Sequence, residues 1–174
     1  MPERLPSTVN PKNYDLYFNI DFEQFLFNGN VKISIQISEP VSIIRLHSEV
    51  LDIISVKLIS HDLETLNITS ELIKSEISIK PDAQLSPGMY FLEIHFKGKL
   101  NDDLSGFYRS RYLDTSGKEA YLATTQFEAP YARKAFPCFD EPEFKATFSV
   151  SMNIPEEMTG ISNMPIDSET VENN

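Results

Sequence analysis

The sequence predicts an all-β fold in which antiparallel sheets pack on one another as a sandwich or saddle, in a single domain over residues 1–174. Three observations predict this fold. Apolar residues recur at every second position through several segments, which places them on one face of a β-strand. Turn-forming pairs such as Asn28-Gly29 and Pro87-Gly88 separate these segments. No segment combines the helical spacing of apolar residues with capping residues.

The first two predicted strands form a hairpin. In residues 14–21, larger apolar side chains alternate with more polar ones, so one face of the strand is expected to be buried. Asn28-Gly29 follows as the predicted turn, because this dipeptide is typical of tight hairpins. Alternation resumes over residues 31–38, which predicts the second strand.

Five further segments are predicted strands. Residues 43–46, 53–59 and 72–79 are rich in β-branched side chains, which favour extended backbone. Residues 90–96 alternate again after a Pro-Gly turn signal. Residues 144–154 form the longest alternating run of the chain, so we expect a long, half-buried strand there.

Residues 106–142 differ from the rest of the chain. Alternation is interrupted there, and aromatic, basic and turn-forming residues crowd together. We expect this segment to be irregular and to hold the functional site, since binding residues concentrate on loops carried by a rigid scaffold.

Composition and charge narrow the possible functions. With 41% hydrophobic residues the chain is expected to fold, and with a net charge of −11 it is expected to repel nucleic acid and anionic membranes. We expect no membrane span and see no secretory leader at the start of the sequence. The single cysteine, Cys138, excludes an internal disulfide and suits a reducing compartment. These features together predict a cytoplasmic protein.

Residues for unaided catalysis are missing from the sequence. His47, His61 and His95 stand alone, without the His-Glu-x-x-His spacing that places two zinc ligands on one helix face. There is no Gly-x-Ser-x-Gly elbow, and Cys138 has no nearby histidine in the sequence. We therefore predict no metal site, no cofactor and no catalytic residue in this chain, and no peptide cleavage by this chain alone.

An ordered motif carries a family resemblance. Thr124-Thr125-Gln126-Phe127-Glu128 precedes Ala135-Phe136-Pro137-Cys138-Phe139-Asp140-Glu141-Pro142, and matches over residues 5–16, 27–29, 106–110 and 161–165 flank them. The chain resembles the N-terminal domain of the gluzincin zinc aminopeptidases. These include aminopeptidase N, the puromycin-sensitive enzyme and the endoplasmic-reticulum aminopeptidases. The resemblance extends over nearly the whole chain.

The resemblance implies two substrate-binding residues. Gln126 would line the pocket for the first side chain of a peptide, and Glu128 would bind the free α-amine of the peptide N-terminus. A carboxylate is suited to the second role, because it forms charge-assisted hydrogen bonds with an ammonium group. The zinc and the catalytic residues would belong to a catalytic domain of the parent enzyme, the implied partner, which this chain lacks. Alternatively, Gln126 and Glu128 are ordinary exposed loop residues.

The rest of the motif is predicted to be structural. We expect Phe136, Cys138 and Phe139 to be buried, and Arg133 to pair with Asp140 or Glu141. A second hypothesis for the whole chain is a free-standing β-sandwich interaction module without an enzymatic partner domain. A His-Glu-x-x-His motif downstream in the gene would decide between the two hypotheses.

Overall fold

The computed structural model describes residues 4–171, and within them the prediction of an all-β fold is confirmed. The described strands, in chain order, are β1 (Val9–Asp21), β2 (Leu26–Ile37), β3 (Ile44–His47), β4 (Asp52–Ser60), β5 (Thr65–Leu66), β6 (Ile68–Ile73), β7 (Glu76–Pro81), β8 (Gly88–Lys99), β9 (Gly106–Leu113), β10 (Glu119–Gln126) and β11 (Thr147–Asn153). The one helical element among these residues is a 3₁₀ turn, η1 (Ala132–Lys134). No helix in this part of the chain is long and apolar enough to cross a membrane.

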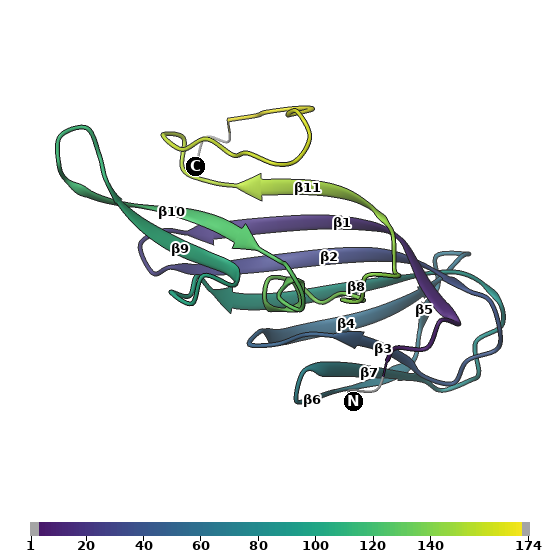
Figure 1. The fold of residues 1–174 in the computed structure, drawn as a ribbon. Coiled ribbons are helices and arrows are strands. Elements are labelled where there is room, and N and C mark those ends of the chain that lie inside the picture. Colours follow the sequence, from purple (N-terminus) through teal and green to yellow (C-terminus); the bar gives the residue numbers. More distant parts are fainter. Residues whose placement is uncertain (1–3, 172–174) are drawn as a thin grey trace.

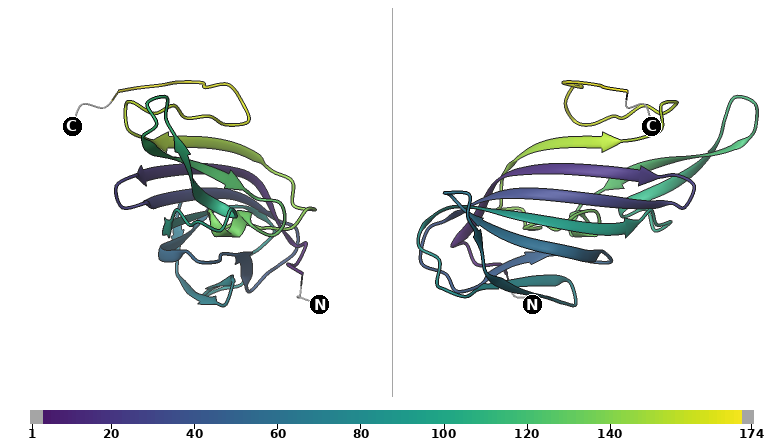
Figure 2. Two further views of the ribbon diagram at one scale, coloured as in Figure 1. Left: turned by 60° about the vertical axis from the view of Figure 1, so that its left-hand side comes forward. Right: turned by 180° about the vertical axis from the view of Figure 1, so that it is seen from behind.

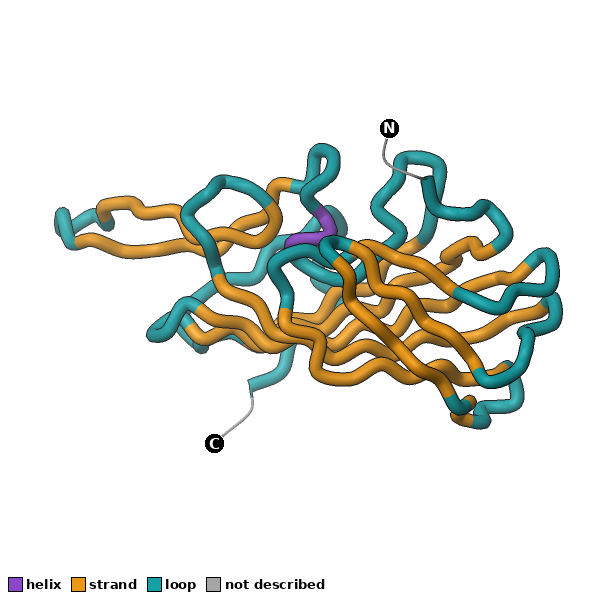
Figure 3. The backbone as a smooth tube through the Cα atoms, turned by 90° about the horizontal axis from the view of Figure 1, so that it is seen from below, coloured by secondary structure: helices purple, strands orange, loops and turns teal. Residues whose placement is uncertain are grey.

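The strands form three sheets (Figure 1). A six-stranded sheet has the order β11-β1-β2-β8-β4-β5, and a three-stranded sheet has the order β3-β7-β6. The third sheet is the hairpin of β9 and β10, which extends away from the other two sheets (Figure 3). Two views rotated about the vertical axis show the curvature of the six-stranded sheet (Figure 2).

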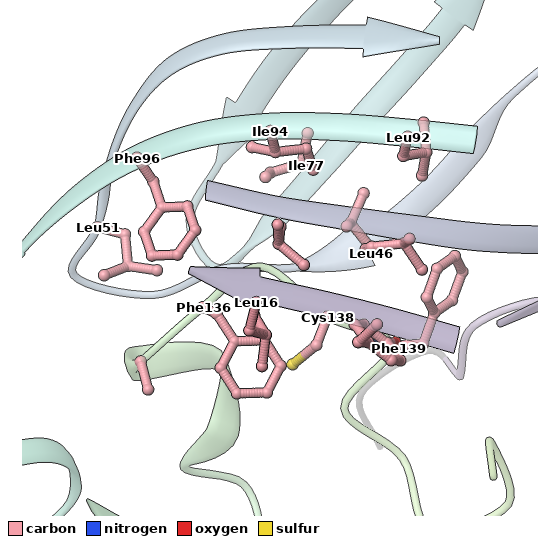
Figure 4. Close-up of a cluster of buried hydrophobic side chains, with 14 of the residues drawn as sticks. Leu16, Leu46, Leu51, Ile77, Leu92, Ile94, Phe96, Phe136, Cys138 and Phe139 are labelled. Carbon is pink, nitrogen blue, oxygen red and sulfur yellow. The ribbon is translucent and has the colours of Figure 1, made fainter. Parts of the chain in front are cut away.

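The core lies on one face of the six-stranded sheet. The register places Leu16 beside Val31 and Val31 beside Ile94, and all three side chains are buried. The core also contains Leu46 and Ile77 from the three-stranded sheet (Figure 4). Full burial of one such side chain contributes about 1.5–3 kcal/mol, so these rows hold the two sheets together.

The opposite face of this sheet carries charges of alternating sign. Asp15 pairs in register with Lys32, Lys32 with Glu93, and Glu93 with Lys57. Lys32 Nζ lies 3.6 Å from Glu93 Oε1. Because opposite charges stand side by side across four strands, this row stabilises the register at a solvent-facing surface.

The predicted turn at Asn28-Gly29 is wrong, because both residues lie inside β2. The chain reverses earlier, before β2, where Asp21 Oδ1 accepts the backbone N–H groups of Glu23 and Gln24. Gly29 has a packing role instead. A Cβ atom there would lie 2.3 Å from the ring of Phe96, so only glycine lets that buried ring lie against the strand.

Two other segments contain hairpins that the sequence does not predict. Residues 72–79 are not one strand, since β6 ends at Ile73 and β7 begins at Glu76 after Lys74, which has a φ of 56°. Residues 106–142 are less irregular than predicted, because β9 and β10 occupy the first half. The irregular part begins only after Gln126, where β10 ends.

The run over residues 144–154 also differs from its prediction. Only Thr147–Asn153 forms a strand, β11, and β11 is parallel to β1, whereas antiparallel pairing was predicted. The expected burial is incomplete, because Phe148 is 55% and Val150 is 42% exposed. Their neighbours in register, Tyr14 and Leu16, are buried. β11 is the edge strand of its sheet, so no described strand lies beside Phe148 and Val150 on its outer side.

Candidate functional site

Gln126 and Glu128 lie together where β10 ends. Gln126 is the last residue of the strand, and its side-chain Oε1 accepts the backbone N–H of Glu128 at 3.0 Å. Both side chains are exposed. The Glu128 carboxylate forms no hydrogen bond or ion pair with any residue between 4 and 171. The bond to Gln126 is made by the backbone of Glu128. The chain therefore holds the backbone of Glu128 in place and leaves its charge available.

The segment after Glu128, which includes η1, packs against the start of β9. Gly106 has a φ of 71°, and a Cβ atom there would lie 2.5 Å from Lys134 Cβ, so η1 packs directly on the glycine backbone. Lys134 Nζ donates to Ser105 Oγ at 3.2 Å and lies 3.9 Å from Glu49 Oε1. These contacts fix the loop that carries Glu128 at both of its ends, because β10 holds one end and η1 the other.

The motif after η1 is bonded to β3 and β1. The backbones of His47 and Cys138 exchange two hydrogen bonds, of 2.8 and 3.0 Å. The backbone N–H of Asp140 donates to His47 Nδ1 at 3.2 Å, and that of Phe139 donates to the Tyr14 hydroxyl at 3.0 Å. Phe136, Cys138 and Phe139 are buried, as predicted, and lie together in Figure 4.

A largely buried ion pair joins η1 to the end of this segment. Arg133 Nε donates to Asp140 Oδ2 at 2.8 Å, and Arg133 Nη2 donates to the Asp140 carbonyl at 3.1 Å. The two side chains are only 13% and 12% exposed. Of the two predicted partners of Arg133, Asp140 is therefore confirmed. Glu141 instead accepts the backbone N–H of Leu5 at 2.8 Å.

Burial favours the uncharged forms of three titratable groups in and beside this segment, Cys138, Tyr14 and His47. Burial raises the pKa of the Cys138 thiol well above its usual value, so the group is not a ready nucleophile. Burial also raises the pKa of the Tyr14 hydroxyl. The pKa of His47 is lowered, chiefly by burial and then by the nearby Arg133 guanidinium. All three groups act as parts of the framework.

Within residues 4–171, no three His, Cys, Asp or Glu side chains lie close enough together to hold a metal ion. His47 is buried and bonded to Asp140, while His61 is exposed in the turn after β4 and His95 is exposed on β8. The donor set that zinc requires is therefore not formed by these residues.

A row of aromatic rings leads from the candidate site to β11, and the sequence predicts no role for it. The Phe127 ring lies 5.7 Å from that of Phe136, which lies 6.3 Å from that of Phe148. Phe148 stacks on Tyr14 at 4.8 Å. Phe127 and Phe148 are partly exposed. In the sequence, Phe127 is visible only as an aromatic residue between the polar Gln126 and Glu128. That pattern does not reveal which distant rings lie beside Phe127 in the fold.

The fold and the motif together define an all-β domain of the kind that precedes the catalytic part of a metallo-aminopeptidase. Residues 10–174 match the family model described as the Peptidase M1 N-terminal domain. The chain belongs to this family.

The relatives are aminopeptidases of several organisms. The chain is 41% identical to puromycin-sensitive aminopeptidase of Caenorhabditis elegans over 179 residues and 40% identical to mitochondrial aminopeptidase 2 of Saccharomyces cerevisiae over 182 residues. It is 38% identical to human endoplasmic reticulum aminopeptidase 1 over 169 residues. These matches cover 97%, 97% and 94% of this chain. The chain spans only 18% of the length of each relative.

Proposed function

We propose that this chain is the substrate-anchoring N-terminal domain of a zinc metallo-aminopeptidase, a hydrolase that removes N-terminal residues from peptides. In this function Glu128 binds the α-ammonium group of the peptide, and Gln126 lines the pocket for the first side chain. One observation supports the proposal above the others. The Glu128 carboxylate is exposed and unpaired among the described residues, while its backbone is held by Gln126.

The chemistry of an exopeptidase requires such a group. A peptide N-terminus carries one positive charge, and a carboxylate held in position distinguishes it from an internal peptide bond by charge-assisted hydrogen bonds. When a neighbouring domain covers the site, water is excluded and the same interaction becomes stronger. Because the described residues form no metal site, the hydrolytic step and its zinc are assigned to a catalytic domain of the longer polypeptide.

The partners follow from this assignment. They are a peptide N-terminus and the catalytic domain, and neither nucleic acid nor a membrane is expected to bind a chain of net charge −11. A cytoplasmic, reducing location is supported by the free thiol of Cys138.

The test replaces Glu128 in the longer polypeptide. Glu128→Gln keeps the size of the side chain and removes its charge, so kcat/KM for a free-amine peptide is expected to fall roughly thirty-fold to a thousand-fold, or about 2–4 kcal/mol of transition-state stabilisation. The thermal unfolding midpoint should stay unchanged, because Glu128 is exposed. Glu157→Gln, another exposed acid of this chain, is the matched control and should retain full activity.

A second measurement separates anchoring from structural damage. An inhibitor that lacks the α-amine should bind the Glu128→Gln variant and the unaltered enzyme equally well, because it never uses the carboxylate. Unaltered kinetics in Glu128→Gln would leave Glu128 an ordinary exposed acid. Equal loss of affinity for both ligands would show that the substitution disturbs the fold. A gene that encodes no peptidase domain downstream would favour the free-standing interaction module.

A further inference from the structure

The loop that carries Glu128, residues 127–131, has few hydrogen bonds to the rest of the fold. In the described part of the chain, its hydrogen bonds reach only Gln126, η1 and other residues of the loop. Gln126 Oε1 accepts the backbone N–H of Glu128 at 3.0 Å, and the N–H of Tyr131 donates to the Phe127 carbonyl at 3.4 Å. Because β10 ends at Gln126, its strand pairing does not extend to Glu128.

The Phe127 ring connects this loop to the core. It lies 5.7 Å from the Phe136 ring at an interplanar angle of 78°, which is an edge-to-face contact. Phe136 is only 4% exposed, and its ring makes further edge-to-face contacts with Tyr14 at 6.0 Å and Phe148 at 6.3 Å. Phe127 therefore packs on a ring that belongs to the core of the domain.

Phe127 stands between Gln126 and Glu128 in the chain. Because Gln126 is the last residue of an extended strand, the side chain that follows it leaves the backbone on the opposite side. Gln126 thus holds the Glu128 backbone from one side, and the Phe127 ring packs on Phe136 from the other. A rotation of the backbone at Phe127 would move both the ring and the Glu128 carboxylate, so the packing of the ring restricts the direction of the carboxylate.

We infer that Phe127 is a positioning residue of the candidate site: its ring, held against Phe136, directs the Glu128 carboxylate toward the α-ammonium group of the peptide. This inference rests on the proposed function of Glu128. Phe127 acts here through Glu128 and does not itself contact the ammonium group. The role is important because a displacement of about 1 Å in a substrate-binding group can cost roughly a hundredfold in rate.

The first test replaces Phe127 in the longer polypeptide that includes the catalytic domain. In Phe127→Ala, kcat/KM for a free-amine peptide is expected to fall roughly tenfold to a hundredfold. The loss should not exceed that in Glu128→Gln, since a misdirected carboxylate costs no more than a missing charge. Phe127→Leu keeps apolar bulk against Phe136 and should recover most of the loss. An inhibitor that lacks the α-amine should bind Phe127→Ala and the unaltered enzyme equally well.

A double-mutant cycle shows whether Phe127 acts through Glu128. Once Glu128→Gln has removed the charge, the direction of the side chain has little further effect on binding of the ammonium group. Adding Phe127→Ala to Glu128→Gln should therefore change kcat/KM by no more than about twofold. Losses that multiply in the double variant would show that the two residues act independently.

Phe144→Ala is the matched control. The Phe144 ring makes a contact of the same kind, 5.6 Å from the Phe139 ring at 62°, and it is more buried than the Phe127 ring. Phe144→Ala should lower the thermal unfolding midpoint at least as much as Phe127→Ala does. At temperatures well below unfolding, it should leave kcat/KM unchanged, because Phe144 lies outside the loop that carries Glu128.

Hydrogen exchange measures the loop without reference to activity. In the longer polypeptide, the backbone amides of residues 127–131 should exchange faster in Phe127→Ala than in the unaltered protein, because the loop loses its contact with the core. Phe144→Ala should leave exchange in this loop unchanged.

Several results would overturn the inference. These are full activity of Phe127→Ala where Glu128→Gln loses activity, losses that multiply in the double variant, unchanged hydrogen exchange in the loop, or weakened binding of the inhibitor without an α-amine. Unaltered kinetics in Glu128→Gln would instead remove the proposed function, and this inference with it.

Discussion

Removing the charge of Asp140 should destabilise the domain strongly. Asp140→Asn leaves the largely buried Arg133 guanidinium without its counter-charge, since the two side chains are only 13% and 12% exposed. Removing one charge of a buried ion pair costs about 3–5 kcal/mol. Because asparagine retains an oxygen that accepts a hydrogen bond from Arg133, we expect a cost of about 3 kcal/mol. With a urea m-value of about 2 kcal/mol/M, the unfolding midpoint should fall by about 1.5 M.

The chain contains a matched control for this experiment. Arg109 donates from Nε and Nη2 to the two carboxylate oxygens of Asp102 at 2.8 and 2.9 Å, so its geometry is at least as good as that of the buried pair. Asp102 is 68% exposed, however, and water replaces the lost interaction. Urea unfolding followed by circular dichroism should show a much smaller shift for Asp102→Asn. Equal shifts for the two variants would refute the argument that burial decides the cost.

Two further predictions concern the framework of the site. The pKa of His47 is lowered from 6.5 in the folded chain, so its contribution to stability is fully present above about pH 6.5 and is lost as the pH falls through the lower folded value. His47→Asn, which keeps an acceptor for the Asp140 N–H, should remove this part of the acid sensitivity in urea unfolding between pH 8 and 5. Retention of the same pH dependence would contradict the assignment. Gly29→Ala should destabilise the fold by about 1–3 kcal/mol, because its Cβ would overlap the buried Phe96 ring. Asn28→Ala, at an exposed position beside it, should change stability little, and equal effects would show that the ring moves away.

The positions of most strands could be predicted from the sequence. Side chains alternate between the two faces of a strand, so the pattern in residues 14–21 or 90–96 reports burial directly. The motif predicts that Gln126 and Glu128 act at one site, and a hydrogen bond joins them at the end of β10, while their binding of substrate stays a prediction. These features depend on residues close together in the chain.

Features that depend on distant residues could not be predicted in the same way. Asn28-Gly29 has the composition of a turn, but the ring of Phe96, from another strand, makes Gly29 a packing position. Arg133 had two acidic candidates next to each other, and the fold directs it to Asp140. Local preference cannot decide such cases, because the competing contact exists only after the strands assemble.

The sequence by itself determined the β class of this protein, the alternation of its strands and the motif that places it among the aminopeptidase N-terminal domains. Only the tertiary structure decided which alternating strand lies at an edge. The pattern of Phe148 and Val150 matches that of Tyr14 and Leu16, yet the first pair is exposed and the second is buried. No described strand lies beside Phe148 and Val150 on the outer side of β11, and the order of strands in a sheet arises from contacts between distant parts of the chain.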